Sequence, residues 1–115
     1  MITINDFVFY PINAFFIFPK GSDGKPDTSK NADFWKITGL VPEVSNNGDP
    51  YFKVYTLFDK PDSFGFSFSD LEKIIKESKV LKVSGITSRD KNYNDTIRFS
   101  SVKILEQKFE IHVIK

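Results

Sequence analysis

The sequence contains no cysteine and one histidine among its 115 residues. Without cysteine the chain can form neither a disulfide nor a thiolate zinc site, and this composition agrees with a reducing compartment. The lone His112 has no second imidazole or thiolate with which to hold a metal ion. We therefore expect no metal site and no other cofactor, and we interpret His112 as a structural residue.

Long apolar runs are also missing. The most apolar stretch is residues 14–18, whereas a membrane-spanning helix needs roughly 18 apolar residues or more. Met1 is followed by Ile-Thr-Ile-Asn-Asp, which lacks the basic residues that open a signal peptide. We expect no membrane anchor, a cytoplasmic protein, and one domain over residues 1–115.

A charge excess of either sign is absent as well. Lys and Arg number 16 and Asp and Glu number 15, which leaves a net charge of +1. A strongly basic chain would point to nucleic acid by charge alone, so any such site here must come from a local arrangement of side chains. The sequence also lacks phosphate-binding glycine loops, G-x-S-x-G, H-E-x-x-H and Gly-rich dinucleotide turns. It predicts a binding module and not an enzyme.

Aromatic residues are what the sequence has in excess. The chain carries 13 Phe, 4 Tyr and 1 Trp, which make up 16% of its residues. Such side chains favour strands, and each offers about 150–250 Å² of surface, more in total than a small domain can easily bury. We expect some rings in a β-rich core and others at the surface, where rings act as stacking platforms.

Hydrophobic alternation predicts the strands. Pro11 predicts a bulge or an edge position in the first strand, and Asn47-Gly48 predicts a hairpin turn between the second and the third. Polar residues 20–31 and 88–95 are expected to be loops. The expected strands are residues 7–18, 34–44, 51–58, 80–87 and 96–105, with a possible sixth at 109–114.

One helix is predicted, at residues 69–79. Ser69 is a suitable N-cap and Glu72 follows three residues later, which forms a capping box, and Leu71, Ile74 and Ile75 form an apolar stripe at helical spacing. Three strands, a helix and two strands match the OB-fold, a five-stranded Greek-key barrel with its helix between strands three and four. A different β-sandwich accommodates a lone helix at this place less well.

The second half of the chain carries a pattern known from one family. A strand YFKVYTLF at 51–58 leads into the helix, and VLKVSGIT at 80–87 follows, with Leu81, Val83 and Gly85 in the places of a "V-x-V-x-G" strand. A polar hairpin then returns as FSSVKIL at 99–105. This half of the chain resembles the single-stranded DNA-binding proteins of bacteria and their phages, and among these it is most similar to the small versions carried by phages of lactococci and related bacteria.

The resemblance implies a function. It implies sequence-nonspecific binding of single-stranded DNA in phage or plasmid replication or recombination, in the host cytoplasm if the gene is a phage gene. A small OB module binds only a few nucleotides, so high affinity needs a homo-oligomer, a dimer or a tetramer. The apolar alternation at residues 109–114 makes that segment the expected oligomer edge.

Tyr51, Lys53 and Tyr55 form the first candidate DNA-binding set. Alternate residues of one strand project to one face, and two rings with a cation between them suit bases and a phosphate of a single strand. The alternative is an ordinary half-exposed strand face, on which tyrosines are common.

Trp35 and Lys36 form the second set. Phe34 and Trp35 are neighbours and point to opposite faces, so only one of them can face a groove. The alternative for the only Trp of the chain is a place in the core.

Arg89, Lys91, Tyr93 and Arg98 form the third set, in and beside the loop 88–95. Arginine can stack on bases as well as pair with phosphates. The alternative is a solvated loop in which nearby aspartates offset the cations.

Two other functions stay open. The chain could be a structural or adaptor protein of a phage that uses its aromatic face as a protein interface. It could also be an OB domain that binds an oligosaccharide or another small ligand on the same rings.

Overall fold

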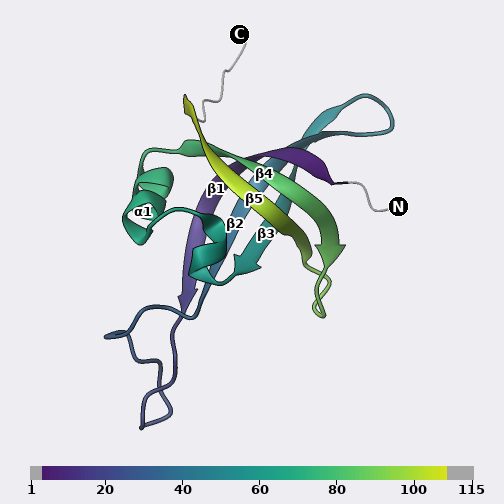
Figure 1. The fold of residues 1–115 in the computed structure, drawn as a ribbon. Helices are drawn as coiled ribbons and strands as arrows, with labels where there is room; N and C mark the ends of the chain where they lie inside the picture. The colour runs from purple at the N-terminus through teal and green to yellow at the C-terminus, as the bar shows by residue number, and fades with distance from the viewer. Residues whose placement is uncertain (1–3, 109–115) are drawn as a thin grey trace.

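The computed structural model describes residues 4–108, which form a β-barrel with one α-helix (Figure 1). The expected strand at 109–114, and with it the expected oligomer edge, lies outside the described residues. The elements in chain order are β1 (Asn5–Ile17), β2 (Phe34–Val44), β3 (Pro50–Asp59), the 3₁₀-helix η1 (Pro61–Phe64), α1 (Phe68–Lys76), β4 (Lys79–Arg89) and β5 (Asp95–Lys108).

The strands close in the order β1-β2-β3-β5-β4, and β4 returns to β1. β1 pairs antiparallel with both β2 and β4, whereas β3 and β5 run parallel and share a single bridge, Thr56 to Thr96. In Figure 1, β4 and β5 cross in front of β1, β2 and β3. A closed five-stranded barrel with α1 between β3 and β4 confirms the expected OB-like fold.

β1 can pair with β4 through its first part and with β2 through its second part because it bends. Its register against β2 shifts between Pro11 and Asn13, which confirms the bulge predicted at Pro11. Gly39 lies opposite Pro11, and a Cβ at Gly39 would collide with the ring of Phe9. The missing side chain therefore lets this fully buried ring cross β2 at the bend.

The capping box of α1 lies two residues before the predicted one. The Ser67 hydroxyl accepts a hydrogen bond from the Asp70 N–H at 3.1 Å, and the Asp70 carboxylate accepts one from the Ser67 N–H at 3.2 Å. The prediction of Ser69 as N-cap was wrong because the earlier box starts the helix at Phe68, whose ring packs 5.1 Å from that of Phe16. The helix also ends earlier, at Lys76.

The core decides which side of β2 and β3 faces outward. Trp35, Ile37 and Val41 of β2 are buried, as are Tyr55 and Leu57 of β3. By alternation, the neighbouring side chains of β2 and β3 point away from the barrel. No helix among the described residues is long and apolar enough to cross a membrane.

Candidate functional site

The outward side of β1, β2 and β3 presents rings around a lysine. The pairing register places Phe15 of β1 opposite Lys36 of β2, and Lys36 opposite Phe58 of β3. Phe15 is 55% exposed and Phe58 is 47% exposed. Phe34 lies two residues before Lys36 and therefore on the same face. We call Phe15, Phe34, Lys36 and Phe58 the aromatic face.

Two rings of the aromatic face hold each other in place. The ring centroids of Phe34 and Phe58 lie 5.1 Å apart, and the ring planes differ by 11°. Stacked pairs of this kind add about 0.5–1.5 kcal/mol beyond their buried area. The contact fixes the orientation of Phe58 while about half of its surface stays open to a ligand.

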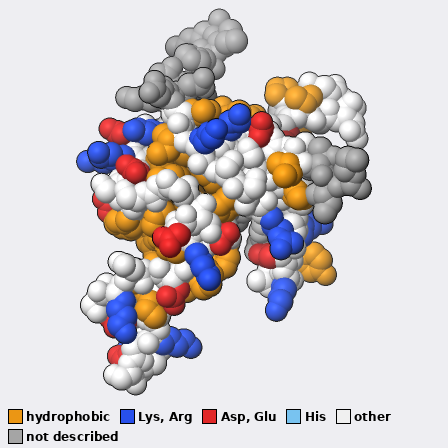
Figure 2. Space-filling view, viewed as in Figure 1, with side chains coloured by type: hydrophobic (Ala, Val, Ile, Leu, Met, Phe, Trp, Pro, Cys, Tyr) orange, Lys and Arg blue, Asp and Glu red, His pale blue; other side chains and the backbone are white. Residues whose placement is uncertain are grey.

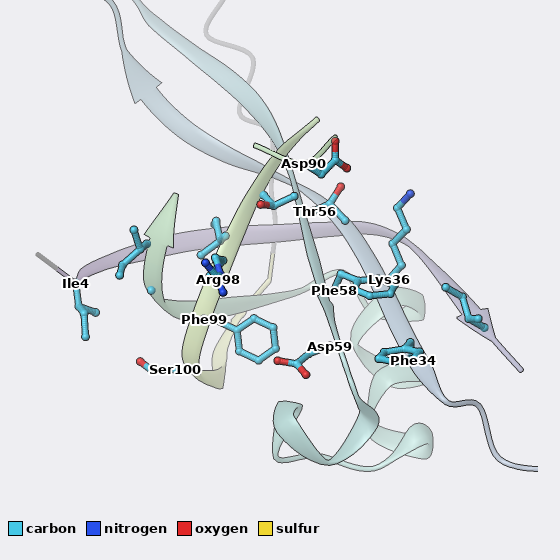
Figure 3. A pocket seen from close by; sticks show the side chains of 15 residues that line it. Ile4, Phe34, Lys36, Thr56, Phe58, Asp59, Asp90, Arg98, Phe99 and Ser100 are labelled. Atoms are coloured by element: carbon cyan, nitrogen blue, oxygen red, sulfur yellow. The ribbon is translucent and has the colours of Figure 1, made fainter. Parts of the chain in front are cut away.

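A groove of about 830 Å³ begins beside the aromatic face. Figure 3 shows Phe34, Lys36 and Phe58 on one side of it and Arg98, Phe99 and Ser100 of β5 toward the other. The groove follows the line along which β3 and β5 meet, where they share only the bridge from Thr56 to Thr96. Past that bridge β3 and β5 no longer pair, and the ring of Phe99 on β5 lies 4.8 Å from that of Phe64 in η1.

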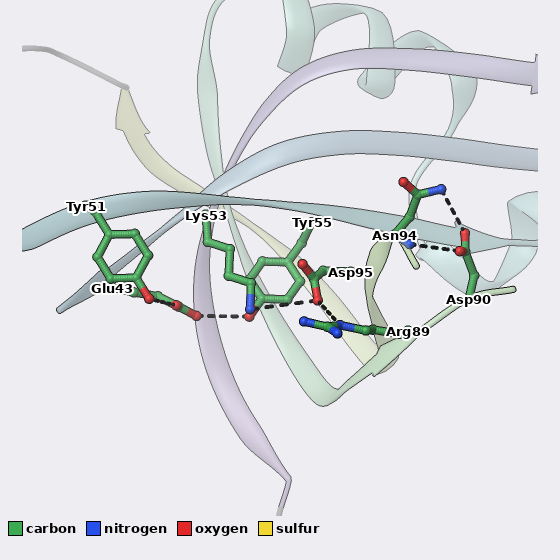
Figure 4. Close-up of polar contacts among 8 residues, drawn as sticks. All are labelled: Glu43, Tyr51, Lys53, Tyr55, Arg89, Asp90, Asn94 and Asp95. Atoms are coloured by element: carbon green, nitrogen blue, oxygen red, sulfur yellow. Dashed lines mark hydrogen bonds and ion pairs between the residues drawn. The ribbon is translucent and has the colours of Figure 1, made fainter. Parts of the chain in front are cut away.

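Both signs of charge line the groove. Lys36 and Arg98 bring cations to it, and Asp59 and Asp90 bring carboxylates. The Asp90 carboxylate accepts hydrogen bonds from the backbone N–H groups of Asn92 at 2.8 Å and Asn94 at 2.9 Å. The side-chain amide of Asn94 donates a further bond at 3.2 Å (Figure 4). The backbone bond from Asn94 is the main reason that the pKa of Asp90 is lowered, and the charge of Lys36 adds to it.

The Asp90 network shapes the loop 90–94 at the rim of the groove. The Tyr93 N–H donates to the Asp90 carbonyl at 3.1 Å, and the Asp90 N–H donates to the Asn94 carbonyl at 3.0 Å. Tyr93 takes the left-handed conformation with φ of 62°, which is uncommon for a residue other than glycine. Its ring is 82% exposed. The loop therefore displays Tyr93, with the exposed Lys91 two residues before it.

Tyr51 and Tyr55 lie on the opposite, inward side of β3 and share one carboxylate. The Tyr51 hydroxyl donates to Glu43 Oε2 at 2.7 Å, and the Tyr55 hydroxyl donates to Glu43 Oε1 at 2.9 Å (Figure 4). Burial, with help from Glu43, raises the pKa of Tyr55 to about 12. The hydrogen bond to Glu43 raises the pKa of Tyr51. Tyr55 is 3% exposed and has no open ring face, whereas Tyr51 is 45% exposed.

Lys53 and Arg89 share a second carboxylate. The Lys53 Nζ lies 3.7 Å from Asp95 Oδ1 and 5.2 Å from the ring centroid of Tyr55. The Arg89 Nε donates to the same oxygen of Asp95 at 3.2 Å. Asp95 thus offsets part of the charge of both Lys53 and Arg89. For Arg89 this agrees with the alternative given for the loop 88–95, in which nearby aspartates offset the cations.

The predicted residues therefore divide into three groups. Lys36 and Arg98 line the groove, and Lys91 and Tyr93 are exposed on the loop whose Asp90 also lines it. The other groups are the network residues Tyr51, Lys53 and Arg89 and the core residues Trp35 and Tyr55. Trp35 is 5% exposed, and its ring packs 5.4 Å from that of Phe64.

Sequence reasoning passed over Phe15 and Phe58. A signal for Phe58 was present, because placing Trp35 in the core turns Lys36 outward by alternation. The turn at Asn47-Gly48 then sets the register of the hairpin, which brings Phe58 opposite Lys36. Phe15 had no comparable signal, since its position depends on the bulge in β1.

The part of the chain that the structure describes contains no group of three or more His, Cys, Asp or Glu side chains that could hold a metal ion. Comparison of the chain with protein-family models, curated proteins and solved structures finds no match.

Proposed function

We propose that this protein binds single-stranded DNA without sequence preference, with bases on the aromatic face and phosphates on the cations beside it. The observation that carries the proposal is the row formed by Phe15, Lys36 and Phe58, two half-exposed rings on either side of a lysine. The outward side of strands 2 and 3 is the surface on which OB-folds bind oligonucleotides and oligosaccharides.

The chemistry of this face favours unpaired bases. A base can lie flat on Phe15 or Phe58 only when it has left its duplex, and each stacked base contributes about 1–3 kcal/mol. Every base has a π-face, so stacking on phenylalanine brings little sequence preference. Lys36, Lys91 and Arg98 add phosphate contacts, and three such contacts give a log–log salt slope of about −2, at roughly −0.7 per phosphate.

The resemblance to single-stranded DNA-binding proteins of bacteria and phages supports a place in phage or plasmid replication or recombination. We further propose that the protein acts as a homo-oligomer, because one face of this size holds only a few nucleotides. Linked faces on one strand then raise the affinity through a high effective concentration.

A protein interface is the second candidate, and a specific observation favours it. Val8, Ile12 and Val54 are between 40% and 54% exposed on β1 and β3. Aliphatic side chains offer bases no ring on which to stack, and exposed apolar surface is typical of contacts between proteins. A structural or adaptor protein would bury these residues against its partner.

A titration with fluorescently labelled DNA separates the two candidates. Anisotropy is measured with an oligo-dT and with a duplex of equal length, each at several salt concentrations. We expect the oligo-dT to bind much more tightly than the duplex, with a salt slope near −2. Equal affinities, or binding without salt dependence, would contradict the proposal. The label belongs on the DNA, because Trp35 is buried and contacts no ligand directly.

A further inference from the structure

The outward side of β4 and β5 carries a second group of cations. In the antiparallel pair of β4 and β5, Lys82 lies directly opposite Lys103, and Ile86 lies opposite Arg98. Figure 2 looks on to this side of the molecule, where Lys and Arg side chains stand out from mostly uncharged surface. We call Lys82, Lys103 and Arg98 the cation track.

The facing lysines are only partly neutralised. Like charges directly opposite each other destabilise a sheet, and the carboxylate of Asp6 on β1 lies near Lys82. Its oxygen lies 3.6 Å from Lys82 Nζ, and it also accepts a hydrogen bond from the Ser84 hydroxyl. Among the described side chains, Lys103 and Arg98 form no ion pair. The track therefore keeps a surplus of positive charge that the fold does not use.

A bulge in β5 places Arg98 on the same side as Lys103. The two residues are five positions apart, so a regular strand would point them to opposite faces. Ser84 pairs with Ser101 and Gly85 pairs with Phe99, which leaves Ser100 as the extra residue that restores the common face. A Cβ at Gly85 would collide with the Arg98 carbonyl oxygen, so glycine is what allows this close approach.

Serines fill the space between the cations. Ser84 and Ser101 occupy the paired position between the two ends of the track, and Ser100 donates its hydroxyl to the Ser84 carbonyl at 3.2 Å. Lysine, arginine and serine are side chains that contact the phosphates of DNA. From Lys82 to Ile86 the track extends over roughly 13 Å of strand. None of its residues has a ring on which a base could stack.

We propose that a single strand leaves the aromatic face past Arg98, which lines the groove, and continues on to β4 and β5, where Lys82 and Lys103 bind its phosphates alone. The inference rests on the proposed function and extends it to a second surface. It predicts a binding site in two parts, one that contacts bases and phosphates and one that contacts only the backbone.

Three kinds of labelled oligonucleotide test the division. The first is an oligo-dT of about 4 nucleotides, near the lower limit for one OB-fold. The second is an oligo-dT of about 10 nucleotides. The third keeps the thymines of the first but extends it to the same length with abasic residues, on the 5′ side or on the 3′ side. Wild-type protein should bind the longer oligo-dT more tightly than the short one. It should also bind one of the two abasic versions, extended on the 5′ or the 3′ side, more tightly than the short oligo-dT. Their salt slopes should be steeper by about 1.4, for two more phosphates at 0.7 each.

A double variant, Lys82→Gln with Lys103→Gln, should lose this gain and bind the short oligonucleotide as before. Lys73→Gln with Lys76→Gln on α1 removes the same charge from exposed positions elsewhere and should keep the gain. The melting temperature of the track variant should stay nearly the same, because removing two facing like charges offsets the loss of the ion pair between Lys82 and Asp6.

The outcomes separate the two proposals. If no oligonucleotide binds, the proposed function fails. If the short one binds and a longer one gains nothing, or if the track variant keeps the gain, the cation track is overturned. If the longer oligo-dT binds more tightly than the short one but neither abasic version does, the protein contacts bases beyond the aromatic face. That result would overturn the backbone-only contact.

Discussion

The sheet of β1, β2 and β3 carries two rings with a lysine between them on each of its faces, and the two faces differ in the partners of their polar groups. On the inward side, the hydroxyls of Tyr51 and Tyr55 both bond to Glu43, and Lys53 lies beside Asp95. On the outward side, Phe15 and Phe58 have no hydroxyl and remain about half exposed around Lys36.

This difference teaches that a ring–cation–ring pattern does not by itself identify a ligand surface. The inward row is completed by carboxylates of the protein and stabilises one end of the barrel. Buried hydroxyls need such partners, whereas phenylalanine needs none and can stay at a surface that a ligand covers. The inward row is distinguished from the outward row by the carboxylates that pair with it, and not by its residue types.

The largest effect should come from breaking the inward row at Tyr55. Tyr55→Ala removes a ring from the core and should lower the free energy of unfolding by about 3–5 kcal/mol. Tyr51→Ala, at a 45% exposed position, should lower it by less than about 1 kcal/mol. Urea unfolding of both variants measures the difference. Equal losses of unfolding free energy in the two variants would contradict the placement of Tyr55 in the core and Tyr51 at the surface.

Breaking the outward row at Phe58 should weaken binding and lower stability less than Tyr55→Ala does, because Phe58 is about half exposed and loses mainly its stacking on Phe34. Phe58→Ala should weaken binding of oligo-dT by about 1–3 kcal/mol, the contribution of one stacked base. Phe68→Ala on α1 is the matched control, because Phe68 is 48% exposed and Phe58 is 47% exposed. Anisotropy titrations compare the two variants with wild type. Equal weakening by both would count against the aromatic face.

Alkaline pH should destabilise the inward row through Tyr55. The pKa of Tyr55 is raised from 10.0 to about 12 in the folded protein. The contribution of protonated Tyr55 to the free energy of unfolding is therefore complete below about pH 10, and it is lost as the pH rises through 12. The loss should reach about 2 kcal/mol at pH 12. Tyr55→Phe removes the ionisable group, and unfolding measured from pH 9 to 12 should then decline less steeply than in wild type. Parallel pH curves for the two proteins would contradict the prediction.

The smallest effect compares Lys36 of the outward row with Arg89, which shares Asp95 with Lys53 of the inward row. Lys36→Gln should reduce the salt slope of oligo-dT binding by about 0.7, because one phosphate fewer is neutralised. Arg89→Gln should leave the slope almost unchanged, because Arg89 already donates to Asp95. Affinities of both variants at four or five salt concentrations give the slopes. A larger reduction for Arg89 than for Lys36 would reverse the assignment of the two rows.

Local signals in the sequence predicted much of the fold. Proline in β1, the Asn47-Gly48 turn and the alternation in β2 all act through neighbouring residues, and the structure confirms the elements that they predict. The helix start was misplaced because Ser67 and Ser69 each have an acidic residue three positions later. Two competing capping boxes cannot be ranked without the contact between Phe68 and the core.

The candidate site was harder to predict, because its exposure depends on how the barrel closes. Alternation correctly separates the two faces of β3, but it does not say which face is inward. That choice is made by the core, which buries Tyr55 and Leu57, and Asp95 and Glu43 then reach Lys53 and Tyr55 from other strands. The rings of the aromatic face come from three strands, so no short stretch of sequence contains the pattern.

The hydrogen bonds around Asp90 also have a consequence for the speed of binding. A flexible loop must be ordered by its ligand, which slows association and lowers affinity. Here Asp90 already holds the turn that displays Tyr93, through bonds from the backbone of Asn92 and Asn94. The conformational entropy of this turn is therefore lost when the protein folds and not when a ligand binds. Under the proposed function, an arriving strand would meet the turn that carries Tyr93 already formed, so diffusion and charge would set the association rate.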